Sequence, residues 1–370
     1  MNSTPTVRNN RIYDNHCGSG SAFRLTNCNV NNVTGNIIAN NFFAYEGEGV
    51  GIVSGCTGQF KRNLIANNGG TGLMLASNTD VINCCIINNA GFNIYHQLGP
   101  TEIMNCIIWG NLSYQIYNSG LAESLLILFT CIQSYEVGGN ALPLYNFLET
   151  TTSDPLFVNP TSGSGIGYNA LTADWNLQIG SPCIDTGNPG SIYDPDGSRA
   201  DMGVYPRNLR PVITRARDYA PEQGHQLDLR WNRSDADKSG VYNDYYSIWR
   251  EGESRSTDAI ILNNPNEFTP ELADSGREII FRDGSRTWYF ITQMSGLGFY
   301  DYGCIAPTLQ DSSSTGTHAA NYMVVYDIAS TGTWTSVPVS GYSVDNIPPY
   351  APARVDIAKG SANQFNLSWD

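Results

Sequence analysis

Residues 63–68 read Asn-Leu-Ile-Ala-Asn-Asn, and variants of this stretch recur along the first part of the chain. Each copy opens with asparagine or cysteine, and in the first five an isoleucine follows two positions later. The six copies begin at Asn10, Asn36, Asn63, Cys84, Cys106 and Cys131, so their starts are separated by 26, 27, 21, 22 and 25 residues. Short apolar segments repeated at this period indicate a solenoid in which each copy belongs to one coil.

Each coil contains a second apolar segment that follows a glycine-rich turn, as in residues 70–75 (Gly-Thr-Gly-Leu-Met-Leu). Glycine and asparagine tolerate the left-handed backbone that a sharp corner between strands requires. Leucine-rich repeats have a similar period, but they need leucine at fixed offsets, whereas isoleucine and asparagine recur here. We therefore predict an all-β fold class in which residues 1–205 form a right-handed parallel β-helix.

The first position of the repeat predicts a ladder of stacked side chains that runs from coil to coil. Asparagine amides can hydrogen-bond to their copies above and below, and cysteine behaves as a small buried hydrophobe. The isoleucine two positions later points the same way, into the core. The predicted structural ladder is Asn10, Asn36, Asn63, Cys84, Cys106 and Cys131. The chain has nine cysteines, and an odd number favours buried thiols over a disulfide framework.

Three segments after the repeat have a different character: DPLFVNP at 154–160, WNLQIGSPCIDTGNP at 175–189 and DPDGSRADMGVY at 194–205. In this order they resemble the C-terminal end of right-handed parallel β-helix proteins of bacterial surface or secreted type. The resemblance implies that these segments close the helix, and it implies an extracellular or cell-surface location.

Residues 211–237, together with YYSIWR at 245–250, resemble a fibronectin type III domain of bacterial extracellular type. Alternating Leu227, Leu229 and Trp231 suit a strand with one buried face. The resemblance implies an immunoglobulin-like β-sandwich over 206–346, with an insertion after Arg250. Residues 347–370 are then a linker and the truncated start of a second such domain, so we expect the chain to be part of a longer protein.

Charge and hydropathy exclude some partners. The formal net charge is −14, yet residues 1–120 contain five acids and five bases, which cancel. We predict no nucleic-acid partner, because no clustered basic face is visible. We also predict no membrane span in this chain, because no apolar run approaches about 18 residues.

Catalytic residues are not evident in the repeat. Residues 78–80 (Asn-Thr-Asp) resemble one motif of the polygalacturonase type of glycosidase, but the other motifs of that family are missing. Glycoside hydrolysis needs two carboxylates, and we expect no such partner for Asp80 on the neighbouring coils. We predict that Asp80 is a turn residue and that the catalytic set is empty.

Two groups of residues are candidates for ligand binding. Asp194, Asp196 and Asp201 resemble part of a calcium loop, which makes Ca²⁺ the one candidate cofactor; the alternative is a structural turn in which Arg199 pairs with one of these acids. Aromatic residues near coil turns can stack on the apolar faces of sugar rings, and packing is their alternative role. These candidates are Tyr95, Trp109, Tyr114 and Tyr117.

The sequence favours a non-enzymatic extracellular scaffold, similar to an adhesin, that contacts glycans along the flank of its β-helix. Its partner would be an extracellular polysaccharide or a component of a host or cell surface. The alternative is a carbohydrate-active enzyme, either a polysaccharide lyase or a glycosidase, whose catalytic coils are absent or unrecognised. Two carboxylates, or a carboxylate and an arginine, on one flank would distinguish the enzyme.

Overall fold

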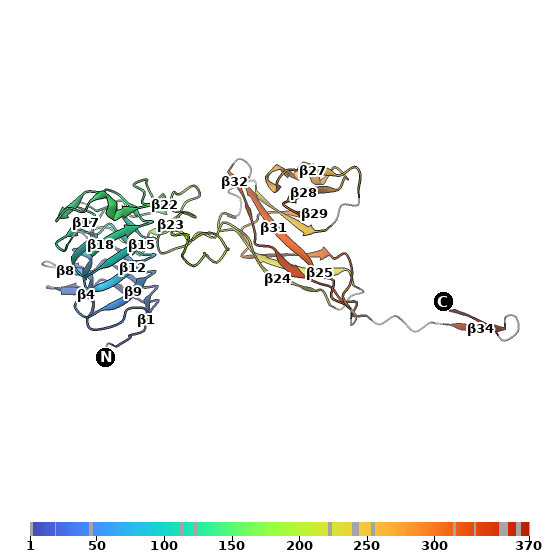
Figure 1. The fold of residues 1–370 in the computed structure, drawn as a ribbon, viewed down its shortest axis with the longest axis horizontal. Helices are drawn as coiled ribbons and strands as arrows, with labels where there is room; N and C mark the ends of the chain where they lie inside the picture. Colours follow the sequence, from blue (N-terminus) through green and yellow to red (C-terminus); the bar gives the residue numbers. More distant parts are fainter. Residues whose placement is uncertain are drawn as a thin grey trace. The chain divides into compact units, whose positions relative to one another are not determined.

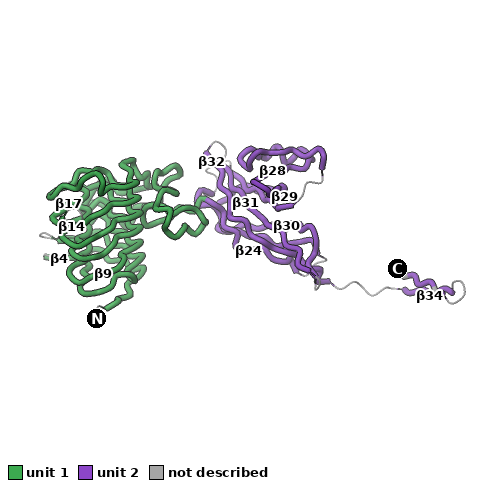
Figure 2. The backbone as a smooth tube through the Cα atoms, in the orientation of Figure 1, with its two compact units in different colours: residues 1–209 green, residues 210–370 purple. Residues whose placement is uncertain are grey.

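The fold described here is that of a computed structural model, in which the chain forms two compact units, residues 1–209 and 210–370 (Figure 2). The structure describes residues 3–18, 20–43, 47–111, 114–121, 124–220, 224–238, 244–252, 256–313, 316–328, 331–347, 354–359 and 364–369. None of the helices in this described part has the length and apolar character needed to cross a lipid bilayer.

Residues 1–209 contain a parallel β-solenoid (Figure 1). Within the described residues three long parallel sheets run along it, to which successive coils add one strand each, and β3 (His16–Cys17) and β7 (Phe42–Phe43) form a further short parallel pair. The first sheet contains β1 (Val7–Arg8), β5 (Val33–Thr34), β9 (Thr57–Lys61), β12 (Asn78–Ile82), β15 (Thr101–Met104), β18 (Leu125–Leu128) and β21 (Phe147–Leu148). The second contains β2 (Arg11–Tyr13), β6 (Ile37–Ala39), β10 (Leu64–Ala66), β13 (Cys85–Ile87), β16 (Ile107–Trp109) and β19 (Cys131–Ile132). The third contains β4 (Gly20–Leu25), β8 (Gly47–Ile52), β11 (Thr71–Ala76), β14 (Ile94–Leu98), β17 (Ile116–Asn118) and β20 (Val137–Gly139).

The isoleucines of the repeat lie in the middle of the second-sheet strands and point into the column. Strand pairing aligns them in one row from coil to coil: Ile12, Ile38, Ile65, Ile86, Ile108 and Ile132. All except Ile12 are fully buried in the interior cluster. The prediction that this position faces the core is confirmed, and Ile132 extends the row by one coil.

The first position of the repeat forms a hydrogen-bonded ladder at the corner before the second sheet. Asn10 Nδ2 donates to Asn36 Oδ1 (3.0 Å), and Asn36 Nδ2 donates to Asn63 Oδ1 (2.9 Å). The Asn63 amide then donates to Cys84 Sγ (3.5 Å). Each side chain therefore accepts a hydrogen bond from the coil before it, so amides and thiols can share one ladder.

The prediction that Cys131 completes this ladder is wrong by one residue. The Cys84 amide donates to Cys106 Sγ (3.4 Å), and the Cys106 amide donates to Thr130 Oγ1 (3.3 Å). Cys131 instead aligns with Ile107 in the second sheet. The ladder selects a side chain that can accept a hydrogen bond, and the Thr130 hydroxyl does so while also donating to the Leu128 carbonyl oxygen (2.9 Å).

A second ladder lies at the opposite corner of the same strands and consists of the asparagines that close the repeat. Asn15 donates to Asn41 (2.8 Å), Asn41 to Asn68 (2.9 Å) and Asn68 to Asn89 (3.0 Å), each from Nδ2 to Oδ1. Asn41, Asn68 and Asn89 are fully buried. The residue before each of these three has a positive φ of 51–54°, which turns the chain toward the third sheet.

The three segments predicted to close the helix lie along a flank of the solenoid. We call residues 154–209 the covering segment. They include the antiparallel pair β22 (Phe157–Asn159) and β23 (Asp174–Leu177), which Figure 1 shows beside the coils. Its apolar side chains share a core cluster with the outer residues of the second sheet: Ala39, Leu64, Ala66, Cys85, Ile87, Ile107, Cys131, Phe157, Ala170, Trp175, Leu177, Cys183, Met202 and Val204.

Hydrogen bonds fix the covering segment to successive coils. Asn67 Nδ2 donates to the Gly163 oxygen (2.8 Å), and Asn105 Oδ1 accepts from the Asn188 amide (2.7 Å). The expectation of closure at the end of the helix is thus corrected to coverage of one side. The reason is that the strands of the second sheet are apolar at nearly every position, so both of their faces need burial.

Residues 210–370 are mainly antiparallel. One sheet contains β24 (Val212–Asp218), β25 (Gln226–Asn232) and β30 (Asp301–Pro307). A larger sheet contains β26 (Asp244–Glu251), β27 (Ile260–Leu262), β28 (Ile279–Asp283), β29 (Arg286–Ser295), β31 (Ala320–Ile328), β32 (Gly332–Thr335) and β33 (Val339–Gly341). In β25, Leu227, Leu229 and Trp231 are fully buried, as their alternation predicts. The last described strands, β34 (Val355–Lys359) and β35 (Phe365–Trp369), form a hairpin.

Among the described residues, four short elements lie between β26 and β29, in the region after Arg250. These are β27, a 3₁₀ turn at Pro265–Glu267, the short helix α1 (Pro270–Ala273) and β28. They pack on a largely aromatic cluster that includes Trp249, Phe268, Phe281 and Trp288. Of these elements, β27 and β28 form one edge of the larger sheet.

Candidate functional site

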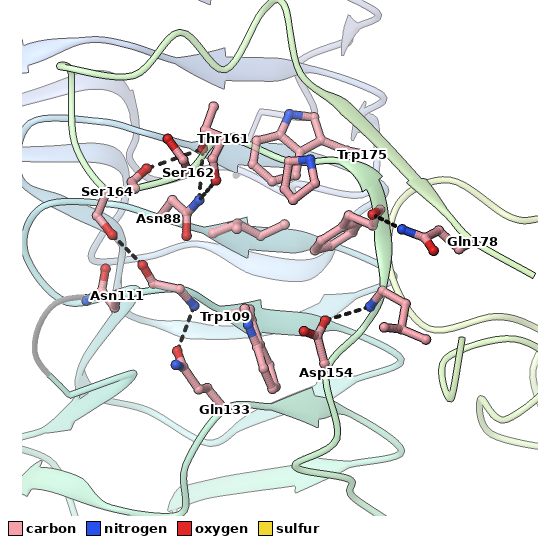
Figure 3. Close-up of a pocket in the computed structure, with 16 residues that line it drawn as sticks. Asn88, Trp109, Asn111, Gln133, Asp154, Thr161, Ser162, Ser164, Trp175 and Gln178 are labelled. Carbon is pink, nitrogen blue, oxygen red and sulfur yellow. Dashed lines mark hydrogen bonds between the residues drawn. The ribbon is translucent and has the colours of Figure 1, made fainter. Parts of the chain in front are cut away.

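A pocket of about 420 Å³ opens between the coils and the covering segment (Figure 3). The coils contribute Ile87, Asn88, Trp109, Gly110, Asn111 and Gln133 to its lining. The covering segment contributes Asp154, Leu156, Phe157, Pro160, Thr161, Ser162, Gly163, Ser164, Trp175 and Gln178. The two groups are distant in sequence, and the pocket exists because the segment folds back along the flank.

Two tryptophans form its aromatic walls. Trp109 is the last residue of β16 and aligns with Ile87 of β13, on the outward face of the second sheet. The covering segment buries Ile87 but leaves Trp109 half-buried. Trp175 is buried, packs edge-to-face on Phe157 (5.4 Å between ring centroids) and donates from Nε1 to the Ala170 oxygen (3.1 Å). Trp175 is thus a fixed wall, and Trp109 is the ring open to a ligand.

A chain of amides connects the second ladder to the pocket. Asn89 Nδ2 donates to Asn93 Oδ1 (3.0 Å), and Asn93 Nδ2 donates to Gln115 Oε1 (2.8 Å). Gln115 Nε2 donates to Gln133 Oε1 (3.1 Å), which also accepts from the Gly110 amide (2.8 Å). In Figure 3 the Trp109 ring lies between Gln133 and Asp154. The Gln133 amide is therefore held in place before any ligand arrives.

Asn111 is a polar residue of the pocket that takes no part in this chain of hydrogen bonds. The repeat places it at the closing position of its coil, where Asn15, Asn41, Asn68 and Asn89 form the ladder in earlier coils. Asn111 Nδ2 instead donates to the backbone oxygens of Gly91 and Tyr114. Its Oδ1 is buried and has no hydrogen-bond partner among the described residues. A buried acceptor without a donor is unfavourable, so this atom favours a ligand that brings one.

The lining suits binding of a hydroxyl-rich ring. Aromatic faces pack against the apolar face of a sugar ring, and amide and carboxylate groups bond its hydroxyls. Asp154 is the only acid among the described lining residues, and its Oδ1 accepts from the Leu156 amide (2.8 Å). Hydrolysis of a glycosidic bond uses a pair of carboxylates.

Three of the four aromatic residues predicted to bind sugars lie close together, and Trp109 lies apart from them. Tyr95 and Tyr117 are aligned in the third sheet, with ring centroids 5.4 Å apart. Phe92, which the sequence did not single out, stacks on Tyr117 at 4.7 Å. A Cβ on Gly138 would lie 2.6 Å from the Tyr114 ring and 2.7 Å from the Tyr117 ring, so both rings cover that glycine. Trp109 is separate, on the second sheet, and it alone of the four lines the pocket.

The acids proposed to bind calcium brace the covering segment. Asp201 accepts from the amides of Asp185 (2.7 Å) and Arg207 (2.6 Å), and Asp194 Oδ2 accepts from the Asp201 amide (2.7 Å). Asp196 Oδ1 accepts from the Ser198 amide (2.9 Å). In the described part of the chain, no group of three or more histidine, cysteine or acidic residues is placed to hold a metal ion. The structure thus does not bring these three acids together as ligands.

Burial of Asp194 and Asp201 predicts a pH dependence of stability. It raises the pKa of Asp194 to about 6 and that of Asp201 to about 7. Between the unfolded pKa and these values the folded chain holds protons that the unfolded chain releases, so stability falls as pH rises from about 4 to 7. We expect the calorimetric transition of residues 1–209 to have a higher Tm near about pH 5 than near about pH 8.

Asp194→Asn supplies the control for this pH dependence. The variant keeps an oxygen that can accept from the Asp201 amide but removes one buried charge. It is expected to reduce the difference between the two Tm values. Equal Tm values for the unmodified chain at both pH values would contradict the prediction.

The residues that sequence reasoning missed are Asn111, Gln133, Asp154 and Trp175. Asn111 and Gln133 carried a signal, because both follow an apolar strand of the repeat. Asp154 and Trp175 belong to segments that were expected at the end of the helix.

Comparison of the chain with protein-family models, with curated proteins and with solved structures finds no match.

Proposed function

We propose that this chain is a non-enzymatic extracellular scaffold that binds glycans on the flank of its β-solenoid. The observation that carries the proposal is the pocket beside Trp109, where aromatic walls stand next to amides held in place by the ladder network. This combination is suited to sugar rings, which have apolar faces and polar edges. The single acid of the described lining supports binding over hydrolysis.

The wider architecture is part of the same proposal. We assign a right-handed winding to the coils and a fibronectin type III-like sandwich to residues 206–346, with a second such domain starting in 347–370. The antiparallel sheets of residues 210–370 support the sandwich, and the sequence resemblance supports the winding and a bacterial surface or secreted origin. The partner would be an extracellular polysaccharide or a glycan of a host or cell surface.

A panel of polysaccharides tests the function. The chain is expected to bind at least one of them without releasing reducing ends or unsaturated products. Trp109→Ala is expected to weaken that binding by about tenfold, equivalent to ~1.4 kcal/mol, because the variant removes the accessible aromatic wall. Isothermal titration calorimetry measures the affinity, and reducing-end and ultraviolet assays measure turnover.

Tyr13→Ala is the matched control. Tyr13 occupies the same outward register as Trp109, on β2, but it lies outside the pocket. Its replacement should leave the affinity unchanged. Product formation would contradict a non-enzymatic role, and a failure to bind any polysaccharide would contradict glycan binding.

A further inference from the structure

We infer that the pocket beside Trp109 selects neutral glycans and rejects those that carry uronate or sulfate groups. This inference rests on the proposed glycan-binding function and adds the chemical class of the ligand. Two observations support the inference. Some hydrogen-bonding groups of the lining already bond to the protein, and the lining contains an acid but no basic residue among its described residues.

The amide donors of the pocket are mostly committed to the protein. Asn88 Nδ2 donates to Thr161 Oγ1 (2.8 Å), and Gln178 Nε2 donates to the Phe157 oxygen (2.8 Å). Asn111 Nδ2 donates to the Tyr114 oxygen (3.3 Å). Of the four lining amides, Gln133 differs, because only its Oε1 makes hydrogen bonds and its whole Nε2 group is left for a ligand; Gln178 Nε2 keeps one further N–H.

Beside these donors and the Ser162 hydroxyl, acceptors of the lining also remain for a ligand. They are the buried Asn111 Oδ1, the carboxylate of the exposed Asp154 and Gln178 Oε1. A sugar hydroxyl can donate to each of them. An ionised carboxylate or a sulfate ester has no proton to donate, so it can satisfy none of them.

The charge of the lining acts in the same direction. Asp154 is the only ionisable side chain among the described lining residues, which include no arginine, lysine or histidine. Sites that bind carboxylate or sulfate groups use such cations, and arginine in particular grips them with two parallel hydrogen bonds. An anionic residue beside Asp154 would meet like charge with no compensating cation.

A titration of neutral and anionic oligosaccharides tests the inference. The neutral set contains gluco-, xylo- and manno-hexaoses, and the anionic set contains hexamers of galacturonate and mannuronate together with a sulfated galactan fragment. At low ionic strength the chain is expected to bind its best neutral ligand at least about tenfold more tightly than its best anionic ligand. Trp109→Ala should weaken binding of the best neutral ligand by about tenfold.

The Asp154→Asn variant tests how much the charge of the Asp154 carboxylate contributes to the preference for neutral ligands. Asparagine keeps the oxygen that accepts from the Leu156 amide, and it replaces a carboxylate oxygen by a donor. The variant is expected to bind the neutral ligand several-fold more weakly and the anionic ligand several-fold more tightly. Asp174→Asn is the matched control, because Asp174 accepts in the same way from the Asn176 amide (3.0 Å) in the covering segment but lies outside the pocket. It should change neither affinity.

The outcomes separate the two proposals. Tighter binding of an anionic ligand that depends on Trp109 would overturn the inference while leaving glycan binding in place. The inference would also fail if Asp154→Asn left the ratio of the two affinities unchanged. Absence of binding to both sets, or an affinity that Trp109→Ala leaves unchanged, would overturn the function on which the inference rests.

Discussion

Replacing Asn68 with alanine is expected to lower the free energy of unfolding of the solenoid by about 4 kcal/mol. Asn68 lies in the middle of the second ladder and is fully buried. Its Oδ1 accepts from the side chain of Asn41 (2.9 Å) and from its amide (3.2 Å), and its Nδ2 donates to the Ile38 oxygen (3.0 Å). Alanine would leave these groups buried without partners, and each such group costs roughly 1–3 kcal/mol.

Urea unfolding followed by circular dichroism measures this loss, and the transition of residues 210–370 serves as an internal reference. Asn15→Ala is the matched control, since Asn15 belongs to the same ladder but is exposed on the first coil. Water can replace its partners, so the control should lose less than about 1 kcal/mol. Losses of equal size in the two variants would show that the ladder does not act through buried hydrogen bonds.

Replacing Trp175 with alanine is expected to loosen the covering segment while the coils stay wound. Truncating a buried tryptophan costs about 3–5 kcal/mol. The edge-to-face contact with Phe157 and the hydrogen bond to the Ala170 oxygen are lost with it. Trp175 shares a cluster with Leu64 and Ile107 on the outer face of the second sheet. Its truncation therefore weakens the packing of the covering segment against the coils.

Hydrogen exchange with mass spectrometry locates the effect. Exchange should accelerate in β22, β23 and their neighbours, and remain slow in β12 and β15 of the first sheet. Tyr193→Ala is the control, because Tyr193 lies in the same segment with its side chain exposed. Equal acceleration in the first sheet would mean that the segment and the coils unfold together, contrary to expectation.

The sequence was sufficient to predict the coils because their register repeats. An isoleucine at the same offset in consecutive coils can lie only on one face, and stacking then aligns it with its copies. The error at Cys131 came from matching residue type. Ile132 lies two positions after Thr130, so the isoleucine offset would have placed Thr130 in the ladder.

The covering segment could not be positioned in the same way, because its contacts join residues far apart in the chain. Asn67 and Gly163 are hydrogen-bonded across 96 residues, and no periodicity links them. One local signal did exist. Residues 37–39 (Ile-Ile-Ala) and 64–66 (Leu-Ile-Ala) are apolar throughout, which is typical of a strand buried on both faces. This pattern indicates that another part of the chain packs on the outer face of the second sheet, but it does not show which part.

The candidate site was only partly predictable for the same reason. Trp109 was found from its aromatic character beside a coil turn, but its partners Asp154 and Trp175 come from the covering segment. Asn111 belonged to a visible pattern, yet its role arises because Asn93 and Gln115 replace it in the hydrogen-bond network. A departure of this kind from a repeated rule is typical of functional positions.

The covering segment also constrains the order and spacing of the coils that it contacts. A bare solenoid can gain or lose coils at little cost, because each coil contacts only its neighbours. Here Asn40, Asn67, Asn88 and Asn105, on successive coils, are each hydrogen-bonded to a fixed point of one continuous segment. Insertion or removal of a coil would shift these points out of step by about 4.8 Å. The register of these four coils is therefore fixed by a segment that is not itself repetitive.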